Sequence, residues 1–525
     1  MDKITYASLG SLGDDFHREF DAALNQARHK LGATHPLILG GKAKKSGTGT
    51  FPDTNPANTS QLIGHFQRGS RADAVKAIEA ARRAFPDWRD LGWKPRVSFL
   101  RSAADEIARH QFKYAAQLTL EVGKNRFEAI AEISEAVDLI LYYCRQMELQ
   151  QGFVQPMGGT GGEQTRSRLK PYGVWAVVAP FNFPFALAAG MAAGALVAGN
   201  TVVFKPASDA PYAGLGLHEA LQRAGLPVGM FNYLTGDGAE LGEELLTNPG
   251  VDGLVFTGSR AVGMDILHRF SATRPRPCLA EMGGKNPAII MPTANLEDAT
   301  EGVLRSAFGM GGQKCSACSR LYLHKNIYAP FLDLLVEKTR RLKIADPVQR
   351  DAFLGPLINE AAVARYRKTV QKGKRDGRVV YGGAVLRDGE FAPGLFVEPA
   401  IIDRLPQKSP LFQEEFFAPI LAVAEITSLD EGIVLANQSD YGLTAGLFSQ
   451  IEGEQEEFFA RIEAGVTYAN RRGGATTGAW PGVQSFGGWK CSGSSGKGAL
   501  GPYYVQQFLR EQSQTIIRPP AALKR

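Results

Sequence analysis

The chain has 525 residues, of which 44% are hydrophobic and 21% charged, and its formal net charge is +6. This length predicts two or three substructures within a compact α/β protein, and the composition excludes a disordered or fibrous chain. The positive charge is spread along the sequence without a basic block, so we expect no nucleic-acid partner. Residues 1–10 lack the apolar core of a secretory signal and five cysteines are too few for a disulfide framework, which predicts a cytoplasmic protein with reduced thiols.

The N-terminal third is expected to be mainly helical. A first helix is expected near residues 14–31, within an extension, residues 1–60, that is otherwise polar and broken by Gly and Pro. From Arg71 to Met147 apolar residues recur at helical spacing, and we expect three amphipathic helical stretches there. The polar alternation at 164–169 follows a Gly-rich segment, 157–162, and predicts a hairpin that leaves the domain.

One stretch, residues 171–204, carries no charged residue and has the length of a membrane span. It is interrupted by Pro180, Asn182, Pro184 and Asn200. The interruptions favour a buried strand at 174–179, an Ala/Gly-rich helix at 185–198 and a second buried strand at 201–204. We therefore expect no membrane partner.

Strand and helix signals alternate to about residue 290, as a parallel sheet requires, and a second α/β stretch follows at 281–468. Its expected strands include 321–323, 379–381 and 420–426. The segment 470–501 is dense in Gly, Ser and Thr with interleaved aromatic residues, which is typical of ordered loops around a site.

Two sequence patterns compete as the dinucleotide site. The run Gly496–Gly501 satisfies G-x-G-x-x-G, but a Ser/Gly run precedes it and Pro502 follows, so it does not lie between a strand and a helix. The junction Val255–Ser259 follows an apolar strand signal and opens a helical one, with Gly263 one turn in. Free N–H groups at such a helix start suit a pyrophosphate, although this kind of junction is more often plain structure.

Cys315 lies in the sequence Gly-Gly-Gln-Lys-Cys-Ser-Ala-Cys, and three interpretations of it remain open. In the first, Cys315 and Cys318 are small structural residues. In the second, they form a C-x-x-C redox or zinc motif. In the third, Cys315 is a nucleophile with a nearby base and oxyanion donor. No second cysteine pair or nearby His supplies further zinc ligands, so we expect no metal.

Six ordered motifs together resemble the signatures of the aldehyde dehydrogenase superfamily. They are Pro180-Phe-Asn-Phe-Pro184, Lys205-Pro-Ala-Ser208, Phe256-Thr-Gly-Ser259, Glu281-Met-Gly-Gly-Lys285, Gly312-Gln-Lys-Cys315 and Glu414-Glu-Phe-Phe-Ala-Pro419. The resemblance implies an α/β fold with a Rossmann-like cofactor domain, an α/β catalytic domain and a bridging strand pair that joins subunits of a homo-oligomer. The corresponding boundaries are 1–152 and 173–280 for the NAD(P)-binding domain, 281–482 for the catalytic domain, and 153–172 and 498–525 for the bridging segments.

The resemblance also implies the roles of individual residues. Cys315 would attack an aldehyde, the Asn182 amide and the Cys315 N–H would hold the oxyanion, and Glu281 would activate the water that releases a carboxylic acid. The implied cofactor-binding residues are Pro180, Phe181, Lys205, Ser208, Gly258, Ser259, Gly263, Glu415 and Phe417. Ser208 stands where NAD-preferring relatives often carry Glu, which would repel a 2′-phosphate, so NAD is expected as the cofactor and NADP is possible.

Within that superfamily the chain resembles most the dehydrogenases of glutamate γ-semialdehyde. The resemblance rests on the long N-terminal extension, on 120–125 and on the tail 477–488. It implies that the substrate is held by Ser316, Gly478, Ala479 and Phe486, with the backbone N–H groups forming a nest for its α-carboxylate. The segment 470–476 is a few residues longer than usual in this group, so another carboxylated semialdehyde remains an alternative.

Two other functions remain alternatives at this stage. One is a non-catalytic dinucleotide-binding protein on the same fold, and the other is a coenzyme A acylating enzyme, which would not need Glu281 as a base. Cys318 prompts a separate hypothesis, because a residue three positions after Cys315 can share a helix face with it and respond to oxidation. The competing interpretation of Cys318 as a small buried hydrophobic residue is favoured.

Overall fold

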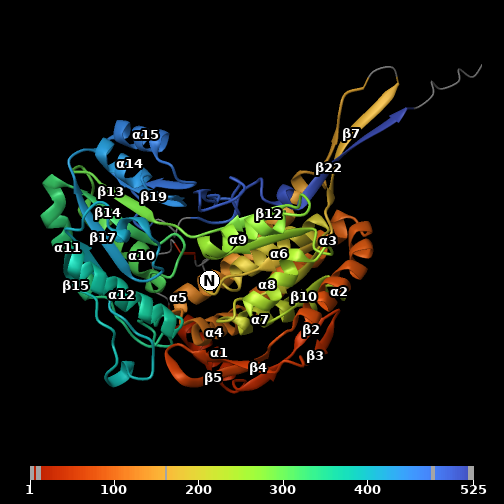
Figure 1. Cartoon of the computed structure of the whole chain (residues 1–525), viewed down its shortest axis with the longest axis horizontal. Helices are drawn as coiled ribbons and strands as arrows, with labels where there is room; N and C mark the ends of the chain where they lie inside the picture. Colours follow the sequence, from red (N-terminus) through yellow and green to blue (C-terminus); the bar gives the residue numbers. More distant parts are fainter. Residues whose placement is uncertain (1–4, 7–12, 160–161, 475–478, 518–525) are drawn as a thin grey trace, which may run out of the picture.

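The structure is a computed structural model that describes residues 5–6, 13–159, 162–474 and 479–517. Two seven-stranded sheets form the two halves of the body (Figure 1). The first sheet has the order β12 (Cys278–Glu281), β11 (Gly253–Thr257), β8 (Val174–Val178), β9 (Thr201–Lys205), β10 (Phe231–Tyr233), β2 (Leu37–Leu39), β3 (Lys42–Lys44). The strands from β12 to β10 are parallel, and β2 and β3 extend the sheet in antiparallel fashion.

Helices connect and cover this first sheet. The connecting helices are α6 (Ala186–Ala198), α7 (Pro211–Arg223), α8 (Gly238–Thr247) and α9 (Arg260–Phe270), and the N-terminal helices are α1 (Asp14–Arg28), α2 (Arg71–Asp90), α3 (Trp93–Arg109), α4 (Gln111–Val122) and α5 (Arg126–Leu149). The prediction of three helical stretches in 71–147 is wrong, because there are four. Gly92 and Gly123 adopt left-handed φ values of 84° and 77°, which separate α2 from α3 and α4 from α5, and His110 separates α3 from α4.

The charge-free stretch forms β8, α6 and β9, as the sequence predicts. Every residue of α6 except Leu187 is buried. Its small residues permit close packing, since a Cβ at Gly190 would lie 3.0 Å from the Leu139 side chain of α5 and one at Gly194 would lie 2.7 Å from Phe508. Within the described parts of the chain, no helix is both long and apolar enough to cross a membrane.

The second sheet carries the nucleophile loop. Its order is β15 (Arg378–Gly382), β16 (Ala400–Asp403), β17 (Ile420–Ile426), β14 (Cys318–His324), β13 (Asn286–Ile290), β19 (Thr444–Phe448), β20 (Val466–Ala469). The three strands expected in this stretch are confirmed as parts of β14, β15 and β17. The helices that accompany this sheet are α10 (Leu296–Phe308), α11 (Tyr328–Arg340), α12 (Glu360–Asp376), α13 (Pro410–Gln413), α14 (Leu429–Asn437) and α15 (Glu452–Arg461).

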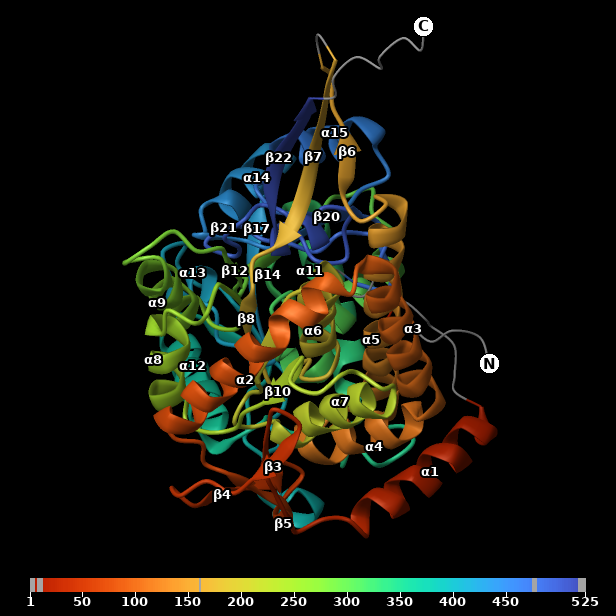
Figure 2. The same cartoon turned by 90° about the vertical axis from the view of Figure 1, so that its right-hand side faces the viewer.

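A third sheet forms an arm that stands off the body (Figures 1 and 2). It has the order β22 (Leu509–Ile517), β7 (Glu163–Pro171), β6 (Val154–Pro156). The hairpin expected at 164–169 is confirmed as β6 and β7, and β22 adds a long antiparallel partner on the other edge of β7. At the opposite end of the body lies a small sheet of β1 (Ala33–His35), β5 (Asn58–Gln67) and β4 (Thr50–Asn55).

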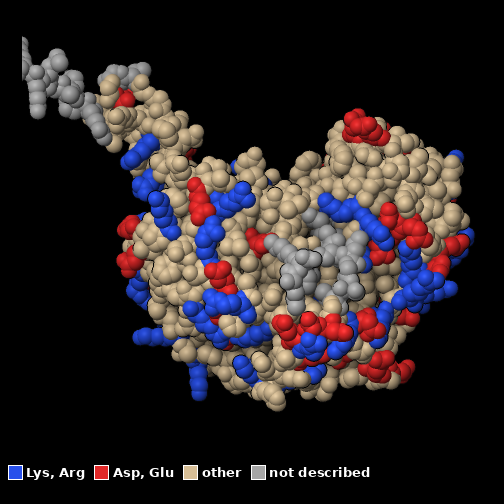
Figure 3. Space-filling model, turned by 180° about the vertical axis from the view of Figure 1, so that it is seen from behind, with Lys and Arg blue, Asp and Glu red and all other residues tan. Residues whose placement is uncertain are grey.

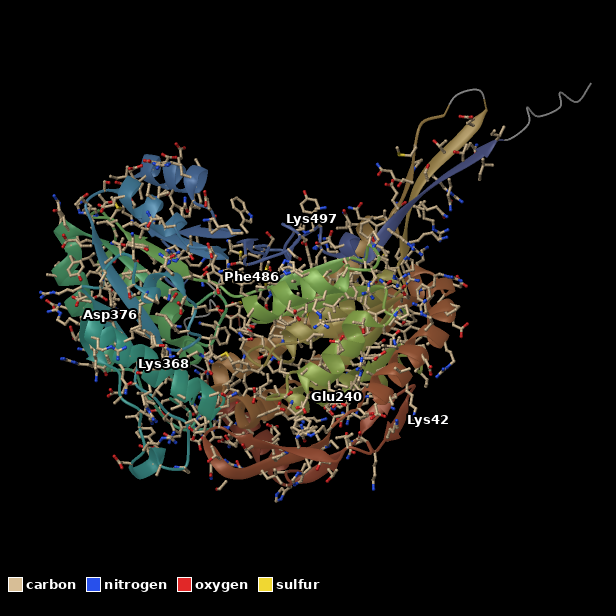
Figure 4. The ribbon with its side chains drawn as sticks, viewed as in Figure 1. Lys42, Glu240, Lys368, Asp376, Phe486 and Lys497 are labelled. Carbon is tan, nitrogen blue, oxygen red and sulfur yellow. The ribbon has the colours of Figure 1, made fainter. Side chains whose placement is uncertain are left out.

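The described part of 470–501 consists mostly of ordered loops between the two sheet-bearing halves. Its one named strand, β21 (Trp489–Lys490), pairs with β18 (Tyr441–Gly442). Phe486 and Lys497 lie on this connecting stretch (Figure 4), and the Phe486 N–H donates to the Ala499 carbonyl at 2.7 Å. On the face seen in Figure 3, basic and acidic side chains are intermingled over the body.

Candidate active site

A cavity of about 450 Å³ lies between the two halves of the body. Both halves and the 470–501 loops contribute to its wall. The lining residues include Glu135, Phe183, Glu281, Cys315, Ser316, Ala479 and Phe486. Segments that are far apart in the sequence therefore meet at one cavity.

The loop before Cys315 has a conformation that only particular residues adopt easily. Met310, Gly311 and Gly312 have left-handed φ values of 53°, 62° and 64°. A Cβ at Gly312 would lie 2.5 Å from the Ala418 carbonyl oxygen, so this position also needs glycine for space. The loop follows α10 and precedes β14, and this placement brings Cys315 to the cavity.

Two amide side chains hold the nucleophile loop in place. The Asn286 Nδ2 group donates to the carbonyl oxygens of Cys315, at 2.8 Å, and Ala317, at 3.0 Å. The Gln313 Oε1 atom accepts from the Ile358 N–H at 3.0 Å. Because Asn286 is the first residue of β13, the backbone of Cys315 is fixed directly to the second sheet.

The Cys315 thiol is a weak acid in this environment. Burial raises its pKa to about 12, and the carboxyl groups of Glu281 and Glu415 act in the same direction. The Ser316 hydroxyl lies 4.0 Å from Cys315 Sγ. A nucleophilic role for Cys315 therefore requires that its proton be removed when substrate and cofactor are present.

Glu281, the last residue of β12, is held by a segment more than 200 residues away in sequence. Its Oε1 atom accepts from the Gly488 N–H at 2.9 Å. The neighbouring Met282 N–H donates to the Ser492 carbonyl at 2.9 Å, and the Ala280 N–H donates to Ser494 Oγ at 2.8 Å. Residues 488–494 therefore form hydrogen bonds along β12, the edge strand of the first sheet.

The carboxyl group of Glu281 has the acidity of a general base that works near neutral pH. Its Oε2 atom is buried and has no hydrogen-bond partner among the described residues. Burial raises the pKa of Glu281 to about 8, and the Gly488 N–H opposes this shift only in part. A buried oxygen without a partner is available to bind a water molecule.

Asn182 lies in the turn between β8 and α6 and is 3% exposed. Its neighbour Phe183 lines the cavity together with Cys315. The structure therefore places the expected oxyanion donor next to the cavity wall.

The expected pyrophosphate site lies at the start of α9. Ser259 caps this helix by accepting from the Val262 N–H at 3.4 Å. The Gly258 N–H donates to the Glu281 carbonyl at 3.1 Å, which joins this turn to β12. A Cβ at Gly263 would lie 2.5 Å from Met282 Sδ, so a glycine is needed where the helix packs against the strand.

Lys205 and Ser208 lie just after β9, at the same carboxyl edge of the first sheet. Lys205 is 6% exposed and its Nζ donates to the Pro206 carbonyl at 3.1 Å. Burial lowers the pKa of Lys205 to about 8. The Ser208 hydroxyl donates to the Gly236 carbonyl at 3.4 Å. Polar ligands in such folds bind at this edge of the sheet.

Glu415 and Phe417 lie in the second half, between α13 and β17, and line a small pocket beside Gly284. Glu415 accepts from the Gly284 N–H at 2.9 Å, and burial raises its pKa to about 7. Phe417 has a φ of 54°, and its ring packs edge to face on Phe181 at a centroid distance of 5.7 Å. Pro180, which precedes Phe181, is buried. The two expected aromatic residues thus form one surface from opposite halves.

Three of the four expected substrate residues line the cavity. Ser316 is 2% exposed and Ala479 is 4% exposed, and Phe486 completes this set. Gly478, the fourth, lies outside the described residues. The contacts of Asn286, Gly488 and Ser494 were not predicted, because no local sequence pattern indicates them.

The structure corrects the geometry expected for Cys318. This residue begins β14 and does not share a helix face with Cys315. Its side chain is 2% exposed within the core of the second sheet, and its Sγ donates to the Arg320 carbonyl at 3.4 Å. The interpretation of Cys318 as a small buried residue is confirmed. Within the described residues, no cluster of three or more His, Cys, Asp or Glu side chains could hold a metal ion.

Comparison with known proteins defines the class. The aldehyde dehydrogenase family matches residues 43–514. The chain is 36% identical over 505 residues to a 1-pyrroline-5-carboxylate dehydrogenase of Geobacillus sp., a match that covers 95% of this chain and 96% of the relative. The chain therefore belongs to the aldehyde dehydrogenase family.

Solved structures agree with this assignment. The 1-pyrroline-5-carboxylate dehydrogenase from Thermus, solved with bound NAD, is 34% identical with a TM-score of 0.92, covering 96% of this chain and 97% of that one. The proline utilization A protein of Bdellovibrio bacteriovorus is 35% identical with the same TM-score of 0.92. The match covers 96% of this chain and 52% of that longer protein. The expected fold class, with its Rossmann-like and catalytic α/β parts, is confirmed.

Proposed function

We propose that this protein oxidises glutamate γ-semialdehyde to glutamate with NAD as the cofactor, a reaction of proline catabolism. The proposal depends above all on one observation: Cys315, Glu281 and Ser316 line the same cavity. Support comes from relatives named 1-pyrroline-5-carboxylate dehydrogenase that match over almost the whole chain. In this account residues 1–152 and 173–280 bind the cofactor, and residues 281–482 carry the catalytic chemistry.

The residues at the cofactor region fit a dinucleotide. The free N–H groups at the start of α9 suit a pyrophosphate, and Lys205 supplies a buried ammonium with donors left for a ribose. When bound, the cofactor accepts a hydride at its nicotinamide ring. Glu415 would bind the ribose next to that ring, and the Phe181–Phe417 surface would pack near it. Ser208 brings no negative charge to the adenosine ribose, so NADP is the second cofactor to test.

The chain's own residues then account for the remaining steps. Cys315 Sγ forms a bond to the aldehyde carbon after its proton has left, and the Asn182 amide with the Cys315 N–H stabilises the oxyanion. Loss of hydride from that carbon leaves a thioester on Cys315. Glu281 takes a proton from water, the resulting hydroxide attacks the thioester carbon, and the C–S bond breaks to release the carboxylic acid and the thiolate.

The substrate's α-carboxylate is assigned to Ser316 and to the backbone N–H groups of Gly478 and Ala479. Ser316 follows the nucleophile directly, and Ala479 is buried at the cavity wall. Donors of this kind bind an anion without a fixed cation. Phe486 packs against the aliphatic part of the substrate.

We also propose that the arm, residues 153–172 with 498–525, joins two copies of the chain. Within these segments the described strands β6, β7 and β22 stand off the body (Figure 1), and most of their residues are exposed or half-buried. Its described tip exposes apolar side chains, with Met157 58% and Ile517 69% exposed. Light scattering after gel filtration should show an assembly larger than one chain. Replacing Ile516 and Ile517 by Asp should yield a monomer, and an unchanged assembly would refute this role of the arm.

The activity itself is tested by NAD⁺ reduction in the presence of glutamate γ-semialdehyde. Cys315→Ser should abolish turnover, whereas Cys491→Ser, at a cysteine that is also half-buried, should retain it. Assays without coenzyme A should give the full rate, because Glu281 supplies the base for hydrolysis. Turnover that persists in Cys315→Ser would refute the mechanism, and a preference for succinic or adipic semialdehyde would correct the substrate.

A further inference from the structure

One face of α5 presents acidic side chains at three-residue spacing, Glu132, Glu135 and Asp138. Each is satisfied by a partner from a different part of the chain. Glu132 forms a fully buried ion pair with Lys124, and Asp138 accepts from the Trp480 indole N–H. Glu135 accepts from the Tyr6 hydroxyl at 2.9 Å, and Tyr6 belongs to the segment before α1. Part of the N-terminal extension therefore reaches the cavity that contains Cys315.

The Tyr6 ring lines this cavity and contacts two other aromatic rings. It packs edge to face on Phe183 with a centroid distance of 5.8 Å and an interplanar angle of 83°. It also packs on Trp480 with a centroid distance of 5.8 Å and an angle of 66°. Phe183 directly follows the proposed oxyanion donor Asn182, and Trp480 directly follows Ala479 of the proposed carboxylate anchor. Tyr6 thus links the two substrate-facing segments on the side of α5.

Neighbouring charges keep Tyr6 in this position. Burial and the carboxyl groups of Glu135 and Glu132 raise the pKa of the Tyr6 hydroxyl, so it remains a protonated donor. The Lys124 ammonium also contacts Phe183, at 3.7 Å from the ring centroid. The Phe183 ring therefore contacts both a cation and the Tyr6 ring, and a movement of either aromatic residue would break these contacts.

We propose that Tyr6 is a specificity-determining residue that limits the length of aldehyde the cavity accepts. The inference rests on the proposed function only in taking the Cys315 cavity as the aldehyde site. The phenol ring occupies space that a longer aliphatic chain would otherwise enter. Each methylene that finds an apolar surface adds about 0.8 kcal/mol, or about fourfold in kcat/KM, and this gain stops where the chain meets the ring.

The test compares kcat/KM for straight-chain aldehydes from propanal to decanal. Tyr6→Ala removes the ring, Tyr6→Phe keeps the ring and removes only the hydroxyl, and Tyr6→Trp enlarges it. The matched control is Tyr503→Ala, because Tyr503 is 59% exposed. We expect Tyr6→Ala to accept chains at least two carbons longer than the parent, with about tenfold or greater gains for those aldehydes. Tyr6→Trp should shift the limit to shorter chains, and Tyr6→Phe and Tyr503→Ala should keep the parent profile.

An unchanged length profile in both Tyr6→Ala and Tyr6→Trp would overturn the proposal, as would an equal shift in Tyr503→Ala. If Tyr6→Ala does not fold, as judged by its circular dichroism melting curve, Tyr6→Leu and Tyr6→Trp decide the question by the same profile. The outcome is separate from that of the proposed function. A parent enzyme that oxidises no aldehyde contradicts the function, whereas an active parent with the same profile in all variants contradicts only the role of Tyr6.

Discussion

The sharpest prediction concerns the pH dependence of the step that Glu281 is proposed to catalyse. Burial raises its pKa to about 8. One unit below this pKa only about a tenth of the groups are carboxylates, and one unit above it about nine tenths are. Because a general base acts in its carboxylate form, hydrolysis of the thioester should become about tenfold faster between pH 7 and pH 9. The steady-state rate shows the same increase when hydrolysis of the thioester is the slowest step.

The assay is rapid mixing of enzyme with saturating aldehyde and NAD⁺, followed by NADH absorbance. The parent should give a burst of one NADH per active site and then a steady rate that rises with an apparent pKa near 8. Glu281→Gln should keep the burst and lose the steady rate by roughly 10²-fold or more, as expected for loss of general-base catalysis. A steady rate that stays pH-independent in the parent, or a Glu281→Gln variant that turns over normally, would refute the reasoning.

Three further predictions concern other parts of the site. Asn182→Ala should lower kcat by about 10²–10³ while the melting temperature changes little, since one oxyanion donor is lost; an unchanged kcat would exclude this role. Ser208→Glu should raise the ratio of kcat/KM for NAD⁺ to that for NADP⁺ at least about tenfold, because the new carboxylate repels a 2′-phosphate; steady-state kinetics with both cofactors check this. Gly284→Ala places a Cβ 2.5 Å from the Cys315 carbonyl. It should destabilise the fold by about 1–3 kcal/mol and impair the thioester burst, measured by denaturant unfolding and rapid mixing.

The sequence predicts much of the fold because local signals and tertiary packing agree there. The stretch 171–204 carries only apolar and small residues between its turn signals, and buried strands with a close-packed helix are the arrangement that satisfies it. The expected cofactor turn at 255–259 is likewise a strand end followed by a capped helix. The helices of 71–147 were undercounted, because a single glycine such as Gly92 ends a helix without changing the apolar period on either side.

For the site, the sequence predicts the residues that belong to motifs but not the contacts that hold them in place. The Gly488 N–H that holds Glu281 is 207 positions away, and the Asn286 amide that clamps Cys315 is 29 positions away. Neither contact has a local signature. The position of Tyr6 at the cavity could not be predicted either, because its hydrogen-bond partner Glu135 is 129 positions away on α5. Such contacts arise only when segments that are far apart in the chain pack together, and no local sequence pattern predicts which segments meet.

The most direct test of the account is to identify the residue that carries the acyl group. Glu281→Gln would be incubated with propanal and NAD⁺, quenched in acid, digested and analysed by mass spectrometry. We expect one propanoyl group per chain, located on Cys315, and no adduct in the Cys315→Ser, Glu281→Gln double variant. An adduct on another residue, or NADH formation without any adduct, would contradict it.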